Sequence, residues 1–217
     1  MITKFYTFSD NSSYNRSFTW AMSINPRSEM THYVCQNCGT IQNFPSGEFD
    51  VELKGGMKYP DILGCGAYPF LIVSETVVFD WENAGITNFE KFTVGVSSIN
   101  SKRLSEISPP QYFRIEITGH CEIDLKASAL KVISFCQECG YLKTDPAIPS
   151  GFRIAAGSWD GTALFRDAIK YPRVSFCTDS ILELAYKYQH TNFRFEPMEG
   201  PLNSASKGIE YLKGKFS

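Results

Sequence analysis

The sequence Cys35-Gln-Asn-Cys38-Gly39 recurs almost unchanged as Cys136-Gln-Glu-Cys139-Gly140. In each copy two residues separate the cysteines, so a tight turn can direct both sulfurs to one point. The glycine that follows can adopt a left-handed conformation, which frees backbone N–H groups to bond the thiolates. Two such turns supply four sulfurs, the complete tetrahedral shell of a structural zinc ion. The motifs therefore predict one Zn²⁺ per chain, with these ligands: Cys35, Cys38, Cys136 and Cys139.

The spacing between the two motifs departs from the common zinc pattern. Compact zinc ribbons separate their cysteine pairs by about 15–20 residues, whereas the 97 residues from Gly39 to Phe135 lie between these two. A metal site tolerates that gap if the fold brings the turns together. Two other interpretations stay open: the cysteines are reduced without metal, or a pair is a redox dithiol. A redox CxxC precedes a long apolar helix pattern, but residues 40–47 read as a short strand and a turn.

Disulfide bonds are the least favoured use of these cysteines. The chain contains seven, an odd number, and its first ten residues lack the apolar core of a signal peptide. Cys65, Cys121 and Cys177 have no partner at a metal-site spacing. We interpret each as a buried thiol that packs as a small apolar residue.

The cysteine motifs belong to a longer internal repeat. Ser74 follows Cys38 by 36 residues, and Ser175 follows Cys139 by the same 36. Thr-Asn-Phe occurs at 87–89 and again at 191–193. We therefore expect an α+β fold of two pseudo-repeated halves, each a CxxCG knuckle, loop, strand, helix and strand, joined by a split zinc-ribbon-like site.

The repeat also sets the expected domain organisation. We expect a single domain over residues 1–217 with duplicated parts at about 31–96 and 131–198. The Ser-rich stretch 97–110, which ends in Pro-Pro, is predicted to be a linker or loop. Residues 199–217 are polar and are predicted to be an appended tail, and residues 1–30 show no decisive pattern.

Each half contains one helical pattern. In the first, Ser74 or Thr76 is a candidate cap and Gly85 a stop signal. In the second, Thr178 or Asp179 is the candidate cap. The apolar side chains at helical spacing predict the two buried faces: Val77, Val78, Trp81 and Ala84 in the first helix, and Ile181, Leu182, Ala185 and Tyr188 in the second.

Composition places the chain among ordinary folded proteins. Hydrophobic residues make up 43% and charged residues 20%, and the formal net charge is −2, which argues against a partner held mainly by its phosphates. The apolar stretch 62–74 is too short to cross a bilayer. We therefore expect a cytoplasmic protein with no membrane and no nucleic acid among its partners.

The sequence lacks the usual signs of an enzyme. It contains no Gly-rich phosphate loop, no HExxH and no GxSxG. Of its three histidines, His32 could replace a metal ligand but reads better as a surface residue, and His190 follows a predicted helix, where it suits the helix dipole. Four thiolates on one zinc ion leave no open position for a reacting water. We expect no catalytic residues.

The paired CxxCG motifs about a hundred residues apart, each followed by a strand and a helix, resemble the double-CxxCG family of myxobacteria. The resemblance covers about residues 31–198 and also rests on the strand Leu71–Ser74 and the ending Phe193–Pro197. Members of that family are immunity proteins of swarming-inhibition toxin systems. The resemblance implies a module that binds and neutralises a cognate protein toxin. The alternative, a zinc-ribbon nucleic-acid binder, would need a basic face with interleaved aromatic residues.

Overall fold

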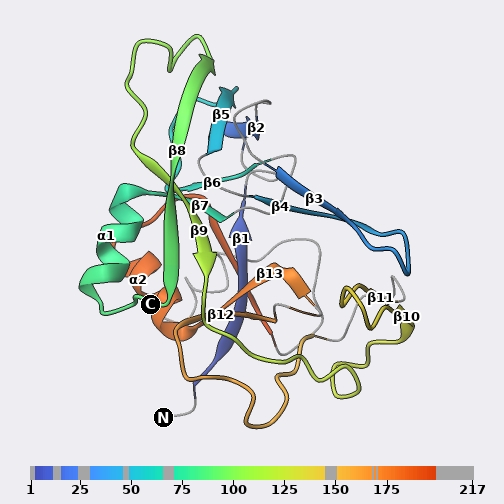
Figure 1. Ribbon diagram of the computed structural model, residues 1–217. Coiled ribbons are helices and arrows are strands. Elements are labelled where there is room, and N and C mark those ends of the chain that lie inside the picture. Colours follow the sequence, from blue (N-terminus) through green and yellow to red (C-terminus); the bar gives the residue numbers. More distant parts are fainter. Residues whose placement is uncertain are drawn as a thin grey trace.

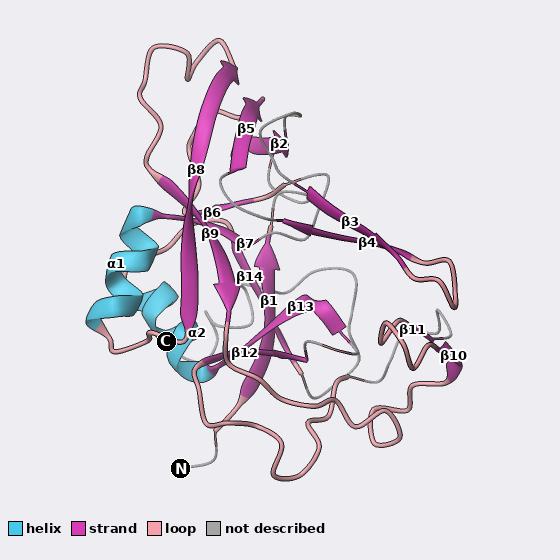
Figure 2. Ribbon diagram, viewed as in Figure 1, coloured by secondary structure: helices cyan, strands magenta, loops and turns pink. Residues whose placement is uncertain are grey.

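The computed structural model describes residues 3–11, 16–23, 30–45, 49–65, 71–144, 151–167, 169 and 171–198. Within these ranges the fold is α+β, as expected, and consists mostly of strands with two helices (Figure 2). The expected tail 199–217 lies outside the described residues. None of the described helices combines the length and the apolar character that crossing a membrane requires.

The elements follow one another along the chain in this order: β1 (Phe5–Asp10), β2 (Trp20–Ser23), β3 (Met30–Val34), β4 (Ile41–Pro45), β5 (Phe49–Lys54), β6 (Ile62–Leu63), β7 (Leu71–Ser74), α1 (Glu75–Asn83), β8 (Phe89–Asn100), β9 (Tyr112–Ile117), β10 (Val132–Phe135), β11 (Leu142–Thr144), β12 (Leu164–Asp167), β13 (Tyr171–Thr178), α2 (Asp179–Lys187) and β14 (Phe193–Pro197).

The larger sheet has six strands in the order β2-β5-β8-β9-β7-β6. Strand β8 is long because it serves two partners: its first part pairs antiparallel with β9 and its second part pairs parallel with β5. Residues 98–100 of β8 lie opposite 52–54 of β5. The expected linker 97–110 was therefore wrong at its start, since this parallel pairing keeps the chain extended to Asn100.

The smaller sheet has four strands in the order β12-β13-β1-β14. Its strand β1, from the beginning of the chain, lies between two strands from the end of the chain and is antiparallel to both. The central position of β1 was not predicted, because only one of its side chains, Phe8, is fully buried.

The two sheets share one arrangement. In each, two strands that are joined by a helix lie on either side of a third strand, which is antiparallel to both. In one sheet β7 and β8 flank β9, and in the other β13 and β14 flank β1. The pairing starts at matching places: Ser74, which precedes α1, lies opposite Tyr112 in β9, and Thr178, which precedes α2, lies opposite Phe5 in β1. In each sheet the central strand comes from the other half of the chain.

Helix α1 begins and ends close to the predicted residues. Ser74 is its N-cap residue, although its hydroxyl donates to Asp61 Oδ1 at 3.0 Å rather than to the helix. Gly85 has φ +78° and ends the helix. The predicted face is buried except for Ala84, which is exposed because it already lies past the helix; Ile86 is buried in its place.

Helix α2 buries Ile181, Leu182 and Ala185 as predicted. Tyr188 was wrongly included in that face: it is the C-cap residue and its side chain is 43% exposed. The two helices lie side by side (Figure 1) and pack, with both sheets, around one apolar core. The most buried members of this core are as follows: Val73, Val77, Trp81, Leu164, Cys177 and Ile181.

Candidate metal centre

Two short hairpins, β3–β4 and β10–β11, carry the CxxCG motifs at their turns. In the first, Val34 pairs with Ile41, and the motif forms the connection. Gly39 has φ +70°, and its N–H donates to the Cys35 carbonyl at 2.9 Å. Cys35 N–H in turn donates to the Thr40 carbonyl at 3.0 Å. The left-handed glycine closes the turn and brings both sulfurs to one side, as the sequence predicted.

The second hairpin repeats this geometry. Phe135 pairs with Leu142, Gly140 has φ +70°, and Gly140 N–H donates to the Cys136 carbonyl at 2.9 Å. Cys136 N–H donates to the Tyr141 carbonyl, also at 2.9 Å. Because both turns follow the same local rules, each forms without help from the other.

The tips of the two hairpins meet on one side of the molecule (Figure 1). Cys35 Sγ lies 3.7 Å from Cys136 Sγ, and Cys38 Sγ lies 3.6 Å from Cys139 Sγ. All four sulfurs lie within 4.8 Å of one another. A tetrahedral site with Zn–S bonds of about 2.3 Å separates its sulfurs by about 3.8 Å. The four predicted ligand residues therefore come together at a spacing that fits a zinc-sized ion.

The environment of the sulfurs favours thiolates on part of the cluster. Backbone N–H groups of Cys139 and Glu138 donate to Cys136 Sγ, which lowers the pKa of that thiol to about 6. The hydroxyl and the backbone N–H of Thr40 likewise lower the pKa of Cys38. Burial raises the pKa of Cys139 to about 12. A bound cation would favour the thiolate form of its sulfur ligands by balancing their negative charge.

The cluster is closed on one side and open on the other. Cys35 and Cys136 are buried, Cys38 is exposed and Cys139 is intermediate. Asn37 Nδ2 reaches from the first hairpin to Cys136 Sγ at 3.6 Å, so the hairpins also contact each other without metal. Four sulfur ligands complete a tetrahedral shell and leave no position for a reacting water, which is the pattern of a structural ion.

The three remaining cysteines stay outside the cluster. Cys121 and Cys177 are buried, as predicted, whereas Cys65 is only partly buried, so its predicted burial was wrong. None of the seven cysteines, all of which the structure describes, forms a disulfide. Burial raises the pKa of the Cys177 thiol. These residues pack rather than coordinate.

The two histidines whose side chains the structure describes, His120 and His190, do not join the cluster. The side chain of His32 lies outside the described residues. His190 Nε2 lies 2.8 Å from Asp80 Oδ2, and the pair is buried between the end of α2 and helix α1. The sequence placed His190 after a helix but gave no sign of this contact, because Asp80 lies in the other half of the chain.

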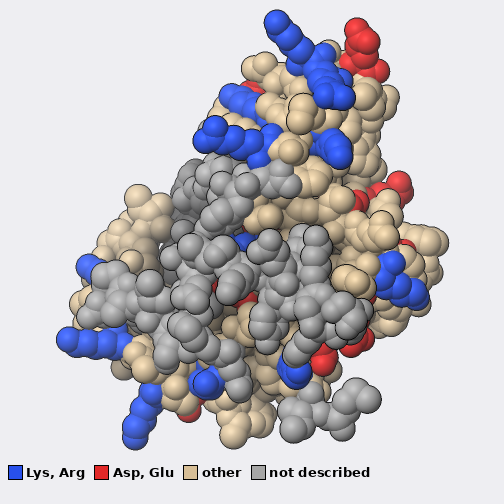
Figure 3. Space-filling view, turned by 180° about the vertical axis from the view of Figure 1, so that it is seen from behind, with Lys and Arg blue, Asp and Glu red and all other residues tan. Residues whose placement is uncertain are grey.

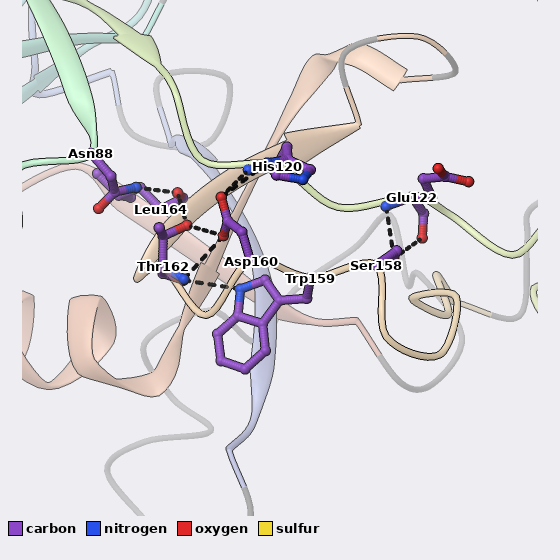
Figure 4. Close-up of polar contacts among 8 residues, drawn as sticks. All are labelled: Asn88, His120, Glu122, Ser158, Trp159, Asp160, Thr162 and Leu164. Carbon is purple, nitrogen blue, oxygen red and sulfur yellow. Dashed lines mark hydrogen bonds and ion pairs between the residues drawn. The ribbon is translucent and has the colours of Figure 1, made fainter.

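Polar side chains near β12 form a second conspicuous group (Figure 4). The Asp160 carboxylate accepts hydrogen bonds from His120 N–H at 2.9 Å and from the Thr162 hydroxyl at 2.6 Å. Ser158 Oγ contacts the backbone of Glu122 and donates to the Ala155 carbonyl at 2.8 Å. No described histidine contacts the Ser158 hydroxyl, so the group lacks an activated nucleophile and instead fixes the loop before β12.

The chain matches no protein-family model, and no curated protein is significantly similar to it.

Proposed function

We propose that this chain is a zinc-stapled immunity protein that binds and neutralises a cognate protein toxin in the cytoplasm of the producing cell. The convergence of the four sulfurs, within 4.8 Å of one another, carries the zinc part of the proposal. A closed sulfur shell suits a binding module rather than an enzyme. The toxin part rests on the resemblance of the paired motifs to the double-CxxCG family.

We also propose that the two halves arose by internal duplication. Ser74 and Thr178 each end the strand before a helix, and Phe89 and Phe193 each begin the strand after it; both pairs are 104 positions apart. Ser175, which the sequence spacing matched with Ser74, lies inside β13, three residues before Thr178. Flanking hydrogen bonds match as well: Glu75 N–H donates to the residue before β9 at 2.8 Å, and Asp179 N–H donates to the residue before β1 at 3.0 Å. Equivalent pairings in both sheets support a common ancestor for the two units.

In this proposal the units have exchanged their first strands. Strand β1 precedes the first knuckle but completes the sheet of the second unit, and β9 precedes the second knuckle but completes that of the first. The zinc ion would then clasp two units that are already interlocked. Such a rigid frame lowers the conformational entropy that the protein loses when it binds a partner.

The partner surface that we propose surrounds the knuckles. Apolar side chains that flank the two CxxCG turns are exposed in the described part of the chain: Val34, Ile41, Ile133, Phe135 and Tyr141. Val34 and Ile41 are direct cross-strand neighbours. Exposed apolar residues gathered at one place are typical of a protein-binding surface, and the metal would hold both hairpins in the binding conformation.

Elemental analysis of protein purified without chelator tests the metal. We expect about one zinc per chain, and loss of zinc together with loss of stability in Cys38→Ser. Ser97→Ala is a control on a distant strand and should retain the metal. If Cys38→Ser keeps its fold but abolishes disulfide exchange, the chain is a thiol oxidoreductase instead.

Co-expression tests the toxin. The gene of the toxin should lie beside that of this chain, and co-expression of the two should rescue growth. Phe135→Asp, on the exposed edge of the second knuckle, should abolish rescue while zinc content stays at one per chain. A folded, zinc-loaded wild-type chain that fails to rescue growth would contradict the proposal.

One observation favours the alternative of nucleic-acid binding. Lys and Arg gather at the upper end of the molecule, seen from behind in Figure 3. The cations at this end follow or belong to β5 and β8: Lys54, Lys58, Lys102 and Arg103. Lys54 is paired with Glu52 at 3.2 Å. Tight, salt-sensitive binding of single-stranded DNA or RNA that Lys58→Glu removes would establish this alternative.

A further inference from the structure

A pocket of about 590 Å³ opens between the loop after α1, the loop before β12 and one face of α2. Its lining mixes apolar residues, Ile86 and Leu184 among them, with small and polar ones. The residues that the argument uses are as follows: Thr87, Asn88, Ala163, Ser180, Glu183 and Lys187. Asn88 spans one side, where its side-chain amide donates to the Leu164 carbonyl (Figure 4). The metal centre and the group around Asp160 do not account for this pocket.

In the other strand–helix–strand unit, β7–α1–β8, the Asp61 side chain occupies the corresponding place. There the corresponding amide, that of Asn192, donates to the Ile62 carbonyl at 2.8 Å. The loop after α2 corresponds to the loop after α1, so Thr191 stands where Thr87 stands in the pocket. Asp61 immediately precedes β6, and Ala163 immediately precedes β12, so these two residues correspond. The filled site therefore indicates which chemistry the pocket is shaped to hold.

In the filled site a carboxylate is bound. Asp61 Oδ2 accepts hydrogen bonds from the N–H and the hydroxyl of Thr191, both at 2.7 Å, and Asp61 Oδ1 accepts one from Ser74 Oγ at 3.0 Å. Three donors, two from Thr191 in the loop after α2 and one from Ser74 at the end of β7, therefore bind this carboxylate. Hydrogen bonds to an ionised acceptor are among the strongest in proteins.

In the pocket the donors are present and the carboxylate is replaced by a methyl group. Ala163 has no acceptor side chain, and among the described residues neither the N–H nor the hydroxyl of Thr87 makes a hydrogen bond. Thr178, at the position of Ser74, shares a 2.6 Å contact with the hydroxyl of Ser180, which lines the pocket. Nearby Asp160 bonds Thr162 and His120 rather than Thr87.

We propose that this pocket binds a carboxylate, either of a small free acid or of an Asp or Glu side chain of a partner protein. The N–H and hydroxyl of Thr87 donate to it, as those of Thr191 do to Asp61. The Ser180 hydroxyl supplies a further donor when it accepts the hydrogen bond from the Thr178 hydroxyl. Lys187 at the lining attracts the anion, and Glu183, one turn earlier on α2, opposes it. The proposal rests on the equivalence of the two units and not on the metal or the toxin.

Amide NMR of the full chain tests the proposal with three probes. Acetate represents a free acid, capped aspartate represents a protein side chain, and capped asparagine is the neutral control. We expect a saturable shift of the Thr87 amide with at least one carboxylate and none with capped asparagine. Tighter binding of capped aspartate than of acetate would assign the site to a partner's side chain, and the reverse to a free acid.

Variants distinguish the pocket from general anion binding. Ala163→Asp supplies the missing carboxylate internally and should abolish probe binding. Thr87→Val, which keeps the N–H and loses the hydroxyl, should weaken binding about tenfold, and Glu183→Gln should strengthen it. Absence of a saturable shift in the wild-type chain, or equal binding by Ala163→Asp or Thr87→Val in folded protein, would overturn the proposal.

Discussion

Gly39 and Gly140 show how single residues decide the shape of the metal centre. Both have φ +70°, a conformation that costs other residues about 1–2 kcal/mol. A Cβ atom on Gly39 meets nothing within 4 Å, whereas one on Gly140 lies 3.1 Å from Ile169 Cγ2. We expect Gly39→Ala to lower the free energy of unfolding by about 1 kcal/mol and Gly140→Ala to lower it further.

Chemical denaturation of the zinc-loaded protein measures this difference. Gly157→Ala is a matched control, because Gly157 has φ +74°, an open environment and no metal ligand nearby. It should match Gly39→Ala in stability while leaving zinc affinity unchanged. If Gly39→Ala and Gly140→Ala lower the free energy of unfolding equally, the Ile169 side chain moves away from the new methyl group without a loss of stability.

Asp160 gives a prediction about pH. Burial alone would raise the pKa of its carboxyl, but hydrogen bonds from Thr162 and from His120 N–H outweigh burial and lower it. A lowered pKa in the folded state stabilises the fold above the unfolded value of about 3.9, and this stabilisation is lost as pH falls through the folded pKa. Asp160→Asn should therefore destabilise the protein at pH 7.

The difference between wild type and Asp160→Asn should shrink as pH falls below about 4. Urea denaturation at pH 7 and at the lowest pH at which both proteins fold measures it. A difference independent of pH would mean that the amide loses packing rather than charge-assisted hydrogen bonds.

The residues that the sequence predicted correctly act through local chemistry. The cysteines and glycines of the two motifs require only their own turns, so the spacing of the motif was sufficient. Tyr188 was misjudged because helical periodicity does not reveal where a helix ends. Gln189 ends α2 with φ +57°, a role that the sequence signals only when glycine fills it, as Gly85 does after α1.

At the scale of elements, the buried pair Asp80–His190 joins the two helices. His190 Nδ1 is also buried, without a hydrogen-bond partner in the described structure. Asp80→Ala leaves the buried imidazole without its hydrogen-bond partner and should cost about 1–3 kcal/mol, the cost of an unsatisfied buried polar group. His190→Ala should cost a similar amount.

The double variant Asp80→Leu, His190→Ile is the informative comparison. In the duplication that we propose, Leu184 and Ile86 hold the positions that correspond to Asp80 and His190, so we expect this apolar pair to suit the local backbone. We expect the double variant to recover most of the stability that the single variants lose. Thermal unfolding measures it, and additive losses would contradict the equivalence of the two positions.

The sequence predicted the elements whose pattern is local. It missed those whose position depends on pairing with a strand far away in the chain. Helices α1 and α2 and the strands before them followed from caps and apolar periodicity. Strand β1 has a mixed burial pattern, and its place in the centre of a sheet depends on β13 and β14, at the far end of the chain. The extension of β8 past Val96 depends in the same way on β5.

At the scale of the whole molecule, the positions of β9 between β8 and β7 and of β1 between β13 and β14 predict that the two halves of the chain stay together without a peptide link or a metal. A protease site inserted after Glu106, in the loop between β8 and β9, should yield two fragments that co-elute in size-exclusion chromatography. They should do so after chelation of zinc as well, because each fragment supplies the central strand of the other's sheet. Fragments that separate on chelation would show that the zinc alone holds them.

The central place of β1 has a consequence for how the protein is made. Strand β1 is synthesised long before its neighbour β13, which begins at Tyr171, 161 positions after Asp10. At about 5–20 residues per second, the nascent strand waits roughly 8–30 s for its neighbours, far longer than local turns take to form. The smaller sheet is thus completed only after β13 and β14 have been made, and β7 and β8 gain the strand between them only after β9 has been made. Neither sheet can therefore form from its own half of the chain alone during synthesis.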